Sequence, residues 1–373
     1  MSSELFIGLM SGTSMDAVDC ALVDLGNKPK DYLLDFINVD IPAMLKSNLQ
    51  SLCHEQLVSL RLLGETDSAI AELFASAAMA ILEKNQISAH QIRAIGSHGQ
   101  TIYHQPPVLD EHAFTLQIAD PNRISVLTGI TAVADFRRKD IALGGQGAPL
   151  LPVFHQHLFG NTQNSRIILN IGGMANITLL RQDDPHLIGF DTGPGNILLD
   201  SWIQAQQDLP YDDHGAWAAS GSSQHDLLSF LLEDPYFSSP PPKSTGREYF
   251  NLSWLRKHLE HFGKEISAQD VQATLVSLSS KSISAAIRDV LDTGEVIVCG
   301  GGASNNFLMQ QLQEDLSGFK LASSDNFGVN SNALEALAFA WFAKQTLDQN
   351  ALDLSKVTGA SRPAILGGIY YAG

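Results

Sequence analysis

The chain is poor in positive charge. Its 373 residues carry 23 Lys and Arg against 40 Asp and Glu, which gives a formal net charge of −17 at pH 7. A field of this sign repels polyanions and argues against nucleic acid as a partner. It also means that a site for a phosphate group has to be built locally, from backbone N–H groups, a metal ion or a few basic side chains.

Long apolar runs and paired cysteines are lacking too. No run approaches the roughly 20 residues that cross a membrane, and the N-terminus, MSSELFIGLMSG, has neither the basic start nor the long apolar stretch of a signal peptide. The three cysteines, Cys20, Cys53 and Cys299, form no CxxC or zinc pattern, and we expect buried, reduced thiols. These absences predict a cytoplasmic protein that has no membrane segment.

Polar loops follow several apolar segments, and the first is GLMSGTSMD at residues 8–16. It lies between two expected strands, so the segment reads as a hairpin. Gly12 permits a tight backbone turn, and the neighbouring hydroxyl and N–H groups can converge on an anion. Asp16 and Asp19 stand beside this site, where carboxylates often hold Mg²⁺ through water. The loop is neither GxxxxGK[ST] nor GxGxxG, and an ordinary hairpin turn is the alternative.

A second loop of this kind, NIGGMAN at residues 170–176, opens the second half of the chain. Gly172 and Gly173 allow the backbone to approach a phosphate closely. A hairpin turn is again the alternative. Because a hairpin followed by strands and helices occurs twice, we expect a duplicated α/β domain.

The third loop, CGGGASN, follows an apolar strand that we expect at residues 296–299. Its glycines Gly300, Gly301 and Gly302 have no packing value in our reading. They suit a flat ligand, such as an adenine ring, that lies against the backbone, or an open helix N-terminus. A flexible linker is the alternative.

A single carboxylate, Asp191, stands in FDTGPGN at the end of an expected strand. Ligands of α/β sheets bind at the carboxyl ends of strands, so this position favours a catalytic carboxylate. The competing role is an N-cap for the helix that we expect after Pro194.

We expect residues 208–247 to be an irregular surface excursion and residues 137–149 to lack regular structure.

These motifs together resemble the anhydro-N-acetylmuramic acid kinases, a family of the sugar kinase/heat-shock ATPase/actin superfamily. The similarity runs from residue 8 to residue 362, so it covers nearly the whole chain. One position departs from the pattern, because Ala17 stands where the family has Gly. The motifs on which the similarity rests are GLMSGTSMDAVDCALV, IGSHGQTIYH, ADFRRKDIALGGQGAPLLP, NIGGMANIT, GFDTGPGNILLD, CGGGASN and VTGASRP.

The resemblance implies an α/β, two-lobed actin-like ATPase (ribonuclease H-like) fold with the nucleotide in the interlobe cleft. We expect the first lobe at residues 1–135 and the second at residues 136–373, with the C-terminal helix packed back on the first. It further implies a cytoplasmic homodimer that uses ATP and Mg²⁺. The implied enzyme opens the 1,6-anhydro ring with water and transfers the γ-phosphoryl group to O6, which gives N-acetylmuramic acid 6-phosphate in peptidoglycan recycling.

The resemblance also implies roles for single residues. Asp191 matches the family's catalytic base, and Asp16 is the expected metal ligand. The expected sugar site contains His98, Arg137, Arg138 and Glu335; a structural histidine, a solvated charge run and a solvated helix glutamate are the alternatives. The expected ATP site consists of Gly12, Thr13, Ser14, Met15, Asp16, Asp19, Asn170, Gly172, Gly173, Gly300, Gly301 and Gly302.

Two other functions fit the same loops. One is a kinase for another sugar on the same fold. The other is a non-catalytic ATPase of the actin or chaperone type, which closes on nucleotide without a sugar site. The Asp191 motif and the lack of a further domain after residue 373 argue against the second of these.

Overall fold

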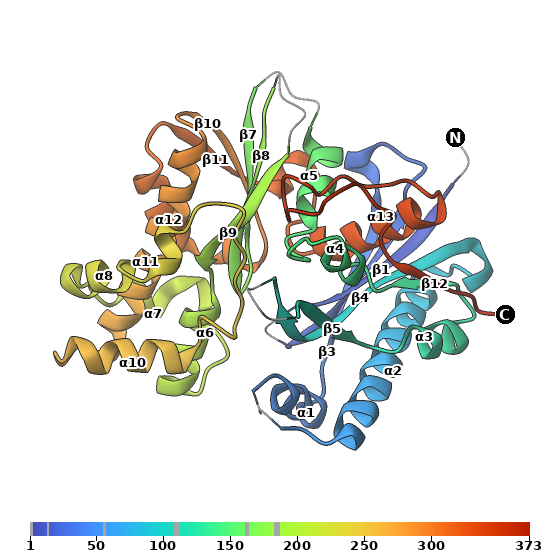
Figure 1. The fold of residues 1–373 in the computed structure, drawn as a ribbon, viewed down its shortest axis with the longest axis horizontal. Helices are drawn as coiled ribbons and strands as arrows, with labels where there is room; N and C mark the ends of the chain where they lie inside the picture. The colour runs from blue at the N-terminus through green and yellow to red at the C-terminus, as the bar shows by residue number, and fades with distance from the viewer. Residues whose placement is uncertain (1–2, 13–14, 55–56, 108–111, 161–163, 183–186) are drawn as a thin grey trace. The chain divides into compact units, whose positions relative to one another are not determined.

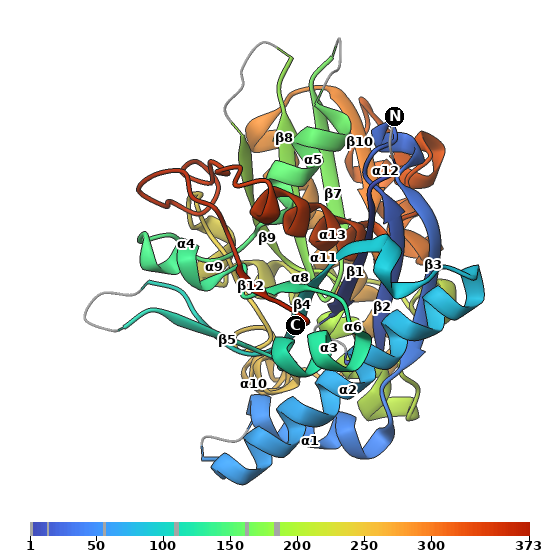
Figure 2. The ribbon, with the colours of Figure 1, turned by 90° about the vertical axis from the view of Figure 1, so that its right-hand side faces the viewer.

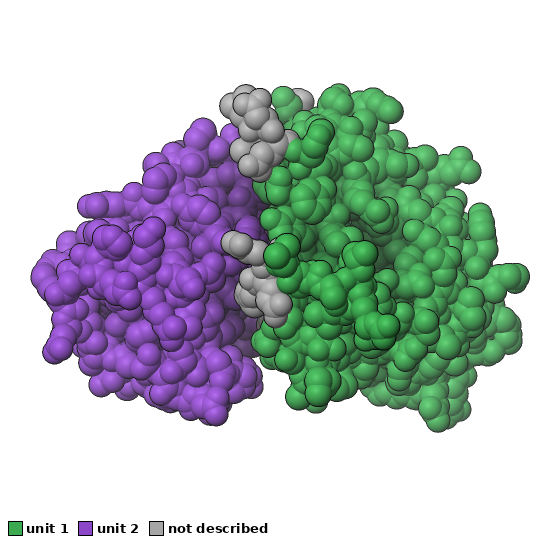
Figure 3. Space-filling model, turned by 60° about the horizontal axis from the view of Figure 1, so that its bottom comes forward, with its two compact units in different colours: residues 1–158, 327–373 green, residues 159–326 purple. Residues whose placement is uncertain are grey.

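The computed structural model describes residues 3–12, 15–54, 57–107, 112–160, 164–182 and 187–373. The chain forms two compact units, which Figure 3 distinguishes by colour. The first unit comprises Met1–Leu158 and Phe327–Gly373, and the second is Phe159–Asn326. The expected division after residue 135 thus differs from the division between these units. In the described part of the chain, no helix is both long and apolar enough to span a membrane.

The first unit is built on a mixed sheet in the order β12-β6-β4-β1-β2-β3, with β5 paired to β4 (Figure 1). β1 pairs antiparallel with β2 and parallel with β4, so the expected first hairpin is present. The strands are β1 (Leu5–Ser11), β2 (Ala17–Asp24), β3 (Leu33–Asp40), β4 (Ile92–Gln105), β5 (Phe114–Ile118), β6 (Ala132–Ala134) and β12 (Gly368–Tyr370).

Helices cover both faces of this sheet (Figure 2). Ile7 and Leu9 of β1 belong to the core cluster shared with α2, whereas Gly8 between them faces α13. Since side chains alternate along a strand, α2 and α13 lie on opposite faces. The helices are α1 (Ala43–His54), α2 (Leu60–Asn85), α3 (Pro121–Thr128), α4 (Arg138–Ala142), α5 (Leu151–Phe159) and α13 (Leu334–Leu347).

Two predictions for this unit were wrong. The apolar spacing predicts a helix over residues 66–84 with Thr66 or Asp67 as its cap, but α2 begins at Leu60, where the Ser59 side chain accepts a hydrogen bond from the Leu62 N–H. Thr66 is instead buried, and Asp67 accepts from the backbone N–H of Ala119 at 2.8 Å. We also expected no regular structure in residues 137–149, yet α4 forms a short helix there.

The second unit contains a sheet in the order β11-β10-β7-β8-β9. β7 and β8 form the second predicted hairpin, and β10 lies parallel to β7. The supposedly irregular residues 208–247 contain three short helices, so that prediction was wrong. The elements are β7 (Arg166–Ile171), β8 (Met174–Leu180), β9 (Ile188–Pro194), β10 (Gly294–Cys299), β11 (Phe319–Ser323), α6 (Ile197–Gln207), α7 (Ala216–Ala219), α8 (His225–Leu232), α9 (Pro235–Ser238), α10 (Leu252–Phe262), α11 (Ala268–Val290) and α12 (Asn306–Asp315).

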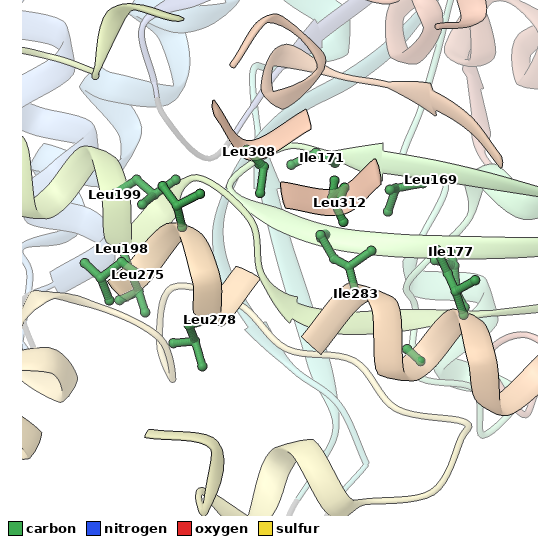
Figure 4. Packing of buried hydrophobic residues seen from close by; sticks show 14 of the residues in the cluster. Leu169, Ile171, Ile177, Leu198, Leu199, Leu275, Leu278, Ile283, Leu308 and Leu312 are labelled. Atoms are coloured by element: carbon green, nitrogen blue, oxygen red, sulfur yellow. The ribbon is translucent and has the colours of Figure 1, made fainter. Parts of the chain in front are cut away.

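The core of the second unit lies between one face of this sheet and its helices (Figure 4). Leu169, Ile171 and Ile177 come from β7 and β8, and α11 contributes Leu275 and Ile283. The opposite face of the same strands therefore carries the alternate residues. Those residues include the polar side chains of the site.

The close approach of α13 to the first sheet yields a stability prediction. A Cβ atom at Gly8 would lie 1.7 Å from the carbonyl oxygen of Ala336, which is backbone of α13. Gly8→Ala should lower the free energy of unfolding by about 3 kcal/mol or more, at the upper end for overpacking. Gly64→Ala is the matched control, because nothing lies within 4 Å of its Cβ position. It should raise stability by about 0.5–1 kcal/mol, since Ala favours helix over Gly.

Denaturant unfolding of both variants measures the difference. A Gly8→Ala protein as stable as wild type would contradict the direct backbone contact between α13 and β1.

Candidate active site

The first polar loop connects β1 to β2. The Met15 N–H bonds the carbonyl oxygen of Gly12 at 3.2 Å, and Met15 has a φ of 56° with its side chain in the core. The Gln100 side chain braces the loop, since its Oε1 accepts from Ser11 Oγ at 2.7 Å and its Nε2 donates to the Gly12 carbonyl at 3.3 Å. The predicted site residues Thr13 and Ser14 lie outside the described residues.

Two predicted carboxylates beside this loop have different surroundings. Asp16 is exposed and forms an ion pair with Lys46 Nζ at 2.5 Å. Asp19 accepts from Asn38 Nδ2, and burial together with the negative charge of Glu335 raises its pKa to about 7. The structure therefore brings Asp19 and Glu335, the latter in the first turn of α13, into one electrostatic group.

His98 and Arg137 form one unit at the end of β4. Arg137 Nε donates to His98 Nε2 at 3.0 Å, so the ring proton lies on Nδ1, which donates to the Gly99 carbonyl at 2.8 Å. Burial, and then the charge of Arg137, hold the pKa of His98 well below 6.5. Both ring nitrogens are thus engaged within the protein, and the imidazole is neutral.

A chain of hydrogen bonds holds Arg137 from the other side. Arg137 Nη1 donates to the Gly147 carbonyl at 2.8 Å. The buried Asp140 accepts from the Gly147 N–H and from Thr358 Oγ1, both at 2.7 Å. Thr358 belongs to the VTGASRP motif near the C-terminus, so this motif stabilises the loop that carries the arginine.

Arg138 has a different environment from its neighbour. Its guanidinium pairs with Asp135 at 2.7 Å and remains more than half exposed. It lines a small pocket of about 40 Å³ together with His98, Asp135 and Tyr370. Asp135 and Ala119, on the wall of this pocket, have φ values of 61° and 112°. Non-glycine residues with positive φ are strained, and such strain is concentrated at functional sites.

Asp191 lies in β9 of the second unit. The helix α6 begins at Ile197, after Asn196, so the alternative of Asp191 as an N-cap is wrong. Its Oδ2 accepts from the Thr245 N–H at 3.0 Å, and its backbone N–H bonds the Lys243 carbonyl at 3.1 Å. Tyr236 Oη donates to the Asp191 carbonyl at 2.7 Å. The carboxylate is therefore held in place by the segment 236–245.

Sequence reasoning missed this clamp. The signal was present in KSTGRE, a basic residue followed by hydroxyls and Gly directly after three prolines. Lys243 Nζ donates to the Tyr236 carbonyl at 3.1 Å and lies 4.7 Å from the Tyr236 ring centroid. Burial lowers the pKa of Lys243, while the charges of Asp289 and Asp191 raise it. The net shift of the Lys243 pKa is downward, and Lys243 interacts electrostatically with the Asp191 carboxylate.

The second glycine loop bonds the start of α6. The Gly172 carbonyl accepts from the Asn196 N–H at 2.9 Å, and the Gly173 carbonyl accepts from Gly195 and Ile197 at 2.9 and 3.0 Å. These bonds leave the loop carbonyls turned to the helix. The two glycines thus form a tight connection between the β7–β8 turn and the start of α6. A phosphate-binding role for the loop stays a prediction.

The triple glycine is only partly free of packing, which corrects our expectation. A Cβ at Gly300 would lie 2.4 Å from Asn170 Oδ1, and one at Gly302 would lie 2.2 Å from Ile171 Cγ2. Gly300 also has a φ of 81°. Only Gly301 has nothing within 4 Å of its Cβ position. Of the three, Gly301 alone has open space for a ligand.

Comparison with known proteins gives a consistent result over the full length. A sequence model described as "anhydro-N-acetylmuramic acid kinase" matches residues 4–372. A relative of that name from Coxiella burnetii is 50% identical over 373 residues, which cover 100% of this chain and 98% of that protein. One from Shewanella halifaxensis is 49% identical and covers 100% of both.

Among solved structures, the chain is similar to the activator of 2-hydroxyisocaproyl-CoA dehydratase from Clostridium difficile with bound ADPNP. The TM-score is 0.45 at 12% identity, over 92% of this chain and 97% of that one. A ROK family glucokinase from Streptomyces griseus in complex with glucose and AMPPNP has a TM-score of 0.40 at 12% identity, over 91% and 99%.

The neutral state of His98 predicts an acid-sensitive stability. Its folded-state pKa lies well below 6.5, so below pH 6.5 the unfolded chain binds a proton that the folded protein does not. The free energy of unfolding should therefore decrease as the pH is lowered below 6.5, and this residue should contribute up to about 1.4 kcal/mol per pH unit to the decrease. His98→Gln cannot titrate and should show a shallower slope between pH 6.5 and 5.5. Parallel curves for the two proteins in denaturant titrations would refute the neutral assignment.

Proposed function

Because the chain belongs to the anhydro-N-acetylmuramic acid kinase family, we propose that it uses ATP to convert 1,6-anhydro-N-acetylmuramic acid into N-acetylmuramic acid 6-phosphate. Water opens the anhydro ring and the freed O6 receives the γ-phosphoryl group. The physiological role is peptidoglycan recycling. Since ATP is the donor, we place the reaction in the cytoplasm, and we carry the family's homodimer forward as part of the proposal.

The observation that carries the mechanism is the held carboxylate of Asp191. Water that attacks an anomeric carbon needs a carboxylate base, as in inverting glycosidases. Asp191 is buried, belongs to a strand, and has its Oδ2 fixed by the Thr245 N–H at 3.0 Å. A base that takes a proton from water has to be held in this way, since misplacement by 1 Å can cost about 100-fold in rate.

In the proposed reaction Asp191 accepts a proton while the water oxygen bonds to C1. The bond between C1 and O6 breaks, and O6 keeps its electron pair and attacks the γ-phosphorus, so that ADP leaves. Phosphoryl transfer of this kind depends on positioning and on neutralisation of charge. Arg138 is our choice for an anionic group of the substrate, because Arg137 is already bonded to His98 and Gly147.

The nucleotide requires groups that tolerate phosphate charge. We assign it to the loop around Gly12, to Gly172 and Gly173, and to the open face of Gly301. Mg²⁺ is implied by the family, and the described residues contain no cluster of three or more His, Cys, Asp or Glu side chains that holds a metal. Mg²⁺ usually binds through one or two carboxylates and the phosphates themselves, so the residues present fit it.

The carboxylates differ in how well they suit the ion. Asp16 already has a cationic partner in Lys46, whereas the pKa of Asp19 is raised to about 7 by burial and by Glu335. A cation beside Asp19 and Glu335 would offset the repulsion between the two carboxylates and favour the ionised form of Asp19. We therefore propose Asp19 beside Asp16 as a carboxylate that faces Mg²⁺. When bound, the ion neutralises charge on the β- and γ-phosphates.

A direct assay tests the function. The purified protein should consume ATP only with 1,6-anhydro-N-acetylmuramic acid in a panel of amino sugars, and release one ADP per sugar phosphate formed. Turnover of a different sugar would favour another kinase on this fold. ATP hydrolysis at the same rate without any sugar would favour the actin or chaperone type of ATPase.

Asp191→Asn tests the base. Asn keeps the size and an oxygen for the Thr245 N–H but takes no proton, so turnover should fall by about 10³–10⁴-fold while ATP binding and the thermal midpoint stay close to wild type. Asp208→Asn is the matched control at the exposed C-terminus of α6, where φ is 58° and Asn is tolerated. It should keep wild-type turnover. Near-normal activity of Asp191→Asn rules out the base.

Gly301→Leu tests the adenosine loop. Because its Cβ position has no neighbour within 4 Å, the variant should fold normally. The leucine should fill the space in front of the backbone and raise the KM for ATP about tenfold or more, with the KM for sugar nearly unchanged. Equal changes in both constants would show that the loop does not contact the nucleotide.

A further inference from the structure

Three polar side chains lie in one row across the second sheet. Asn170 of β7 is the direct partner of Asn176 in β8, and Asn176 is the direct partner of Asp191 in β9. Side chains of directly opposed residues in antiparallel strands have Cβ atoms roughly 5 Å apart on the same face. Asn176 is therefore the immediate neighbour of the proposed base.

The row is on the face opposite to the apolar core. On β7 and β8 the residues on either side of the row belong to that core, and on β9 the residue before Asp191 does. Because successive side chains point to opposite faces, Asn170, Asn176 and Asp191 share the other face. The flanking core residues are Leu169, Ile171, Ala175, Ile177 and Phe190.

Asn176 has an unmet hydrogen-bonding group beside this base. Its Oδ1 is buried and has no hydrogen-bond partner in the described part of the protein. The hydroxyl of Thr245, whose N–H holds Asp191, is also buried without one. Buried polar atoms are nearly always paired in native structures, so an unpaired acceptor needs an explanation.

The chemistry of these atoms limits what fills the space. Asn176 Oδ1 and the Asp191 carboxylate are both acceptors. An anion such as a phosphate oxygen would be repelled by them, whereas an O–H group can donate to either. A water molecule has two protons and can donate to both at once.

We propose that Asn176 is a catalytic residue that, with Asp191, holds the water that attacks the anomeric carbon. This proposal rests on the proposed function. One water proton is donated to Asp191 and is transferred to it as the oxygen bonds to C1. The other is donated to Asn176 Oδ1 and stays on the new C1 hydroxyl, while the bond between C1 and O6 breaks. With both protons fixed, a lone pair of the water is aimed at C1.

Asn176→Leu removes the acceptor and keeps the volume. The kcat should fall by about 100-fold, within the range of general base catalysis, and the KM for ATP should not change. The thermal midpoint should stay the same or rise, because an apolar group replaces a buried atom that had no partner. A merely structural asparagine would instead lose stability.

Asn85→Leu is the matched control. Its Nδ2 donates to Asp35 at 2.7 Å and to the Ile81 carbonyl at 2.8 Å, so this amide has partners. The control variant should lose thermal stability and keep its kcat. Asn176→Leu should therefore lower kcat without lowering thermal stability, and Asn85→Leu should lower thermal stability without lowering kcat.

Asn176→Asp keeps an acceptor and adds a second carboxylate beside Asp191. Like charges disfavour ionisation, so the acid limb of the kcat/KM profile should move to higher pH by about one unit or more. Lys243 and Tyr236, which interact electrostatically with Asp191, are unchanged in this variant. A profile that coincides with wild type would place residue 176 away from the base.

The outcomes separate the proposal from the proposed function. An active wild type with an equally active Asn176→Leu refutes the water-binding role alone. A raised KM for the sugar with unchanged kcat assigns Asn176 to a sugar hydroxyl and also overturns it. A wild type that does not convert the anhydro sugar refutes the proposed function and this proposal with it.

Discussion

The close contact between α13 and the first sheet is the constraint on which the first unit depends. Gly8 of β1 and Gly96 of β4 face the backbone of this helix, where a Cβ would lie 1.7 and 1.9 Å from its carbonyl oxygens. That approach sets the position of Glu335, whose charge raises the pKa of Asp19. It also places the Phe339 ring 4.6 Å from the His98 ring. Gly8 and Gly96 thus allow the close approach that places Glu335 near Asp19 and Phe339 against His98.

A second constraint acts on Asp191 in the other unit. The segment 236–245 contacts it through the side chain, the N–H and the carbonyl, by way of Thr245, Lys243 and Tyr236. Two of these bonds fix the backbone of Asp191 and the third, from the Thr245 N–H, holds the carboxylate itself, so the side chain is restrained. Such preorganisation suits a base, because no reorganisation is needed as charge moves in the transition state.

Much of the fold followed from the sequence. The two hairpins and the buried strands were predicted because apolar alternation and glycine turns are local signals. The start of α2 was not, since Thr66 and Ser59 are both good caps and tertiary burial of Thr66 decided between them. The short helices in residues 208–247 lacked a long apolar period. The clamp of Asp191 by the segment 236–245 depends on contacts between residues about 50 positions apart, which no local pattern reveals.

The site was predictable in its parts but not in its pairings. The sequence placed Arg137 and Arg138 together, yet only the structure separates the one bonded to His98 from the one at the pocket. The triple glycine was recognised as unusual, but the packing of Gly300 against Asn170 depends on two strands that are distant in sequence. Asn176 was overlooked because its register with Asp191 follows from the bulge between Ala175 and Asn176.

The central claim is that water opens the ring at C1 while O6 accepts the phosphoryl group. The most direct test is the reaction of the anhydro sugar and ATP in water labelled with oxygen-18, quenched early. The account predicts one labelled oxygen at C1 and a phosphorus NMR signal without an isotope shift, since O6 comes from the sugar. Label in the bridge between C6 and phosphorus, or in the transferred phosphoryl group, would contradict it.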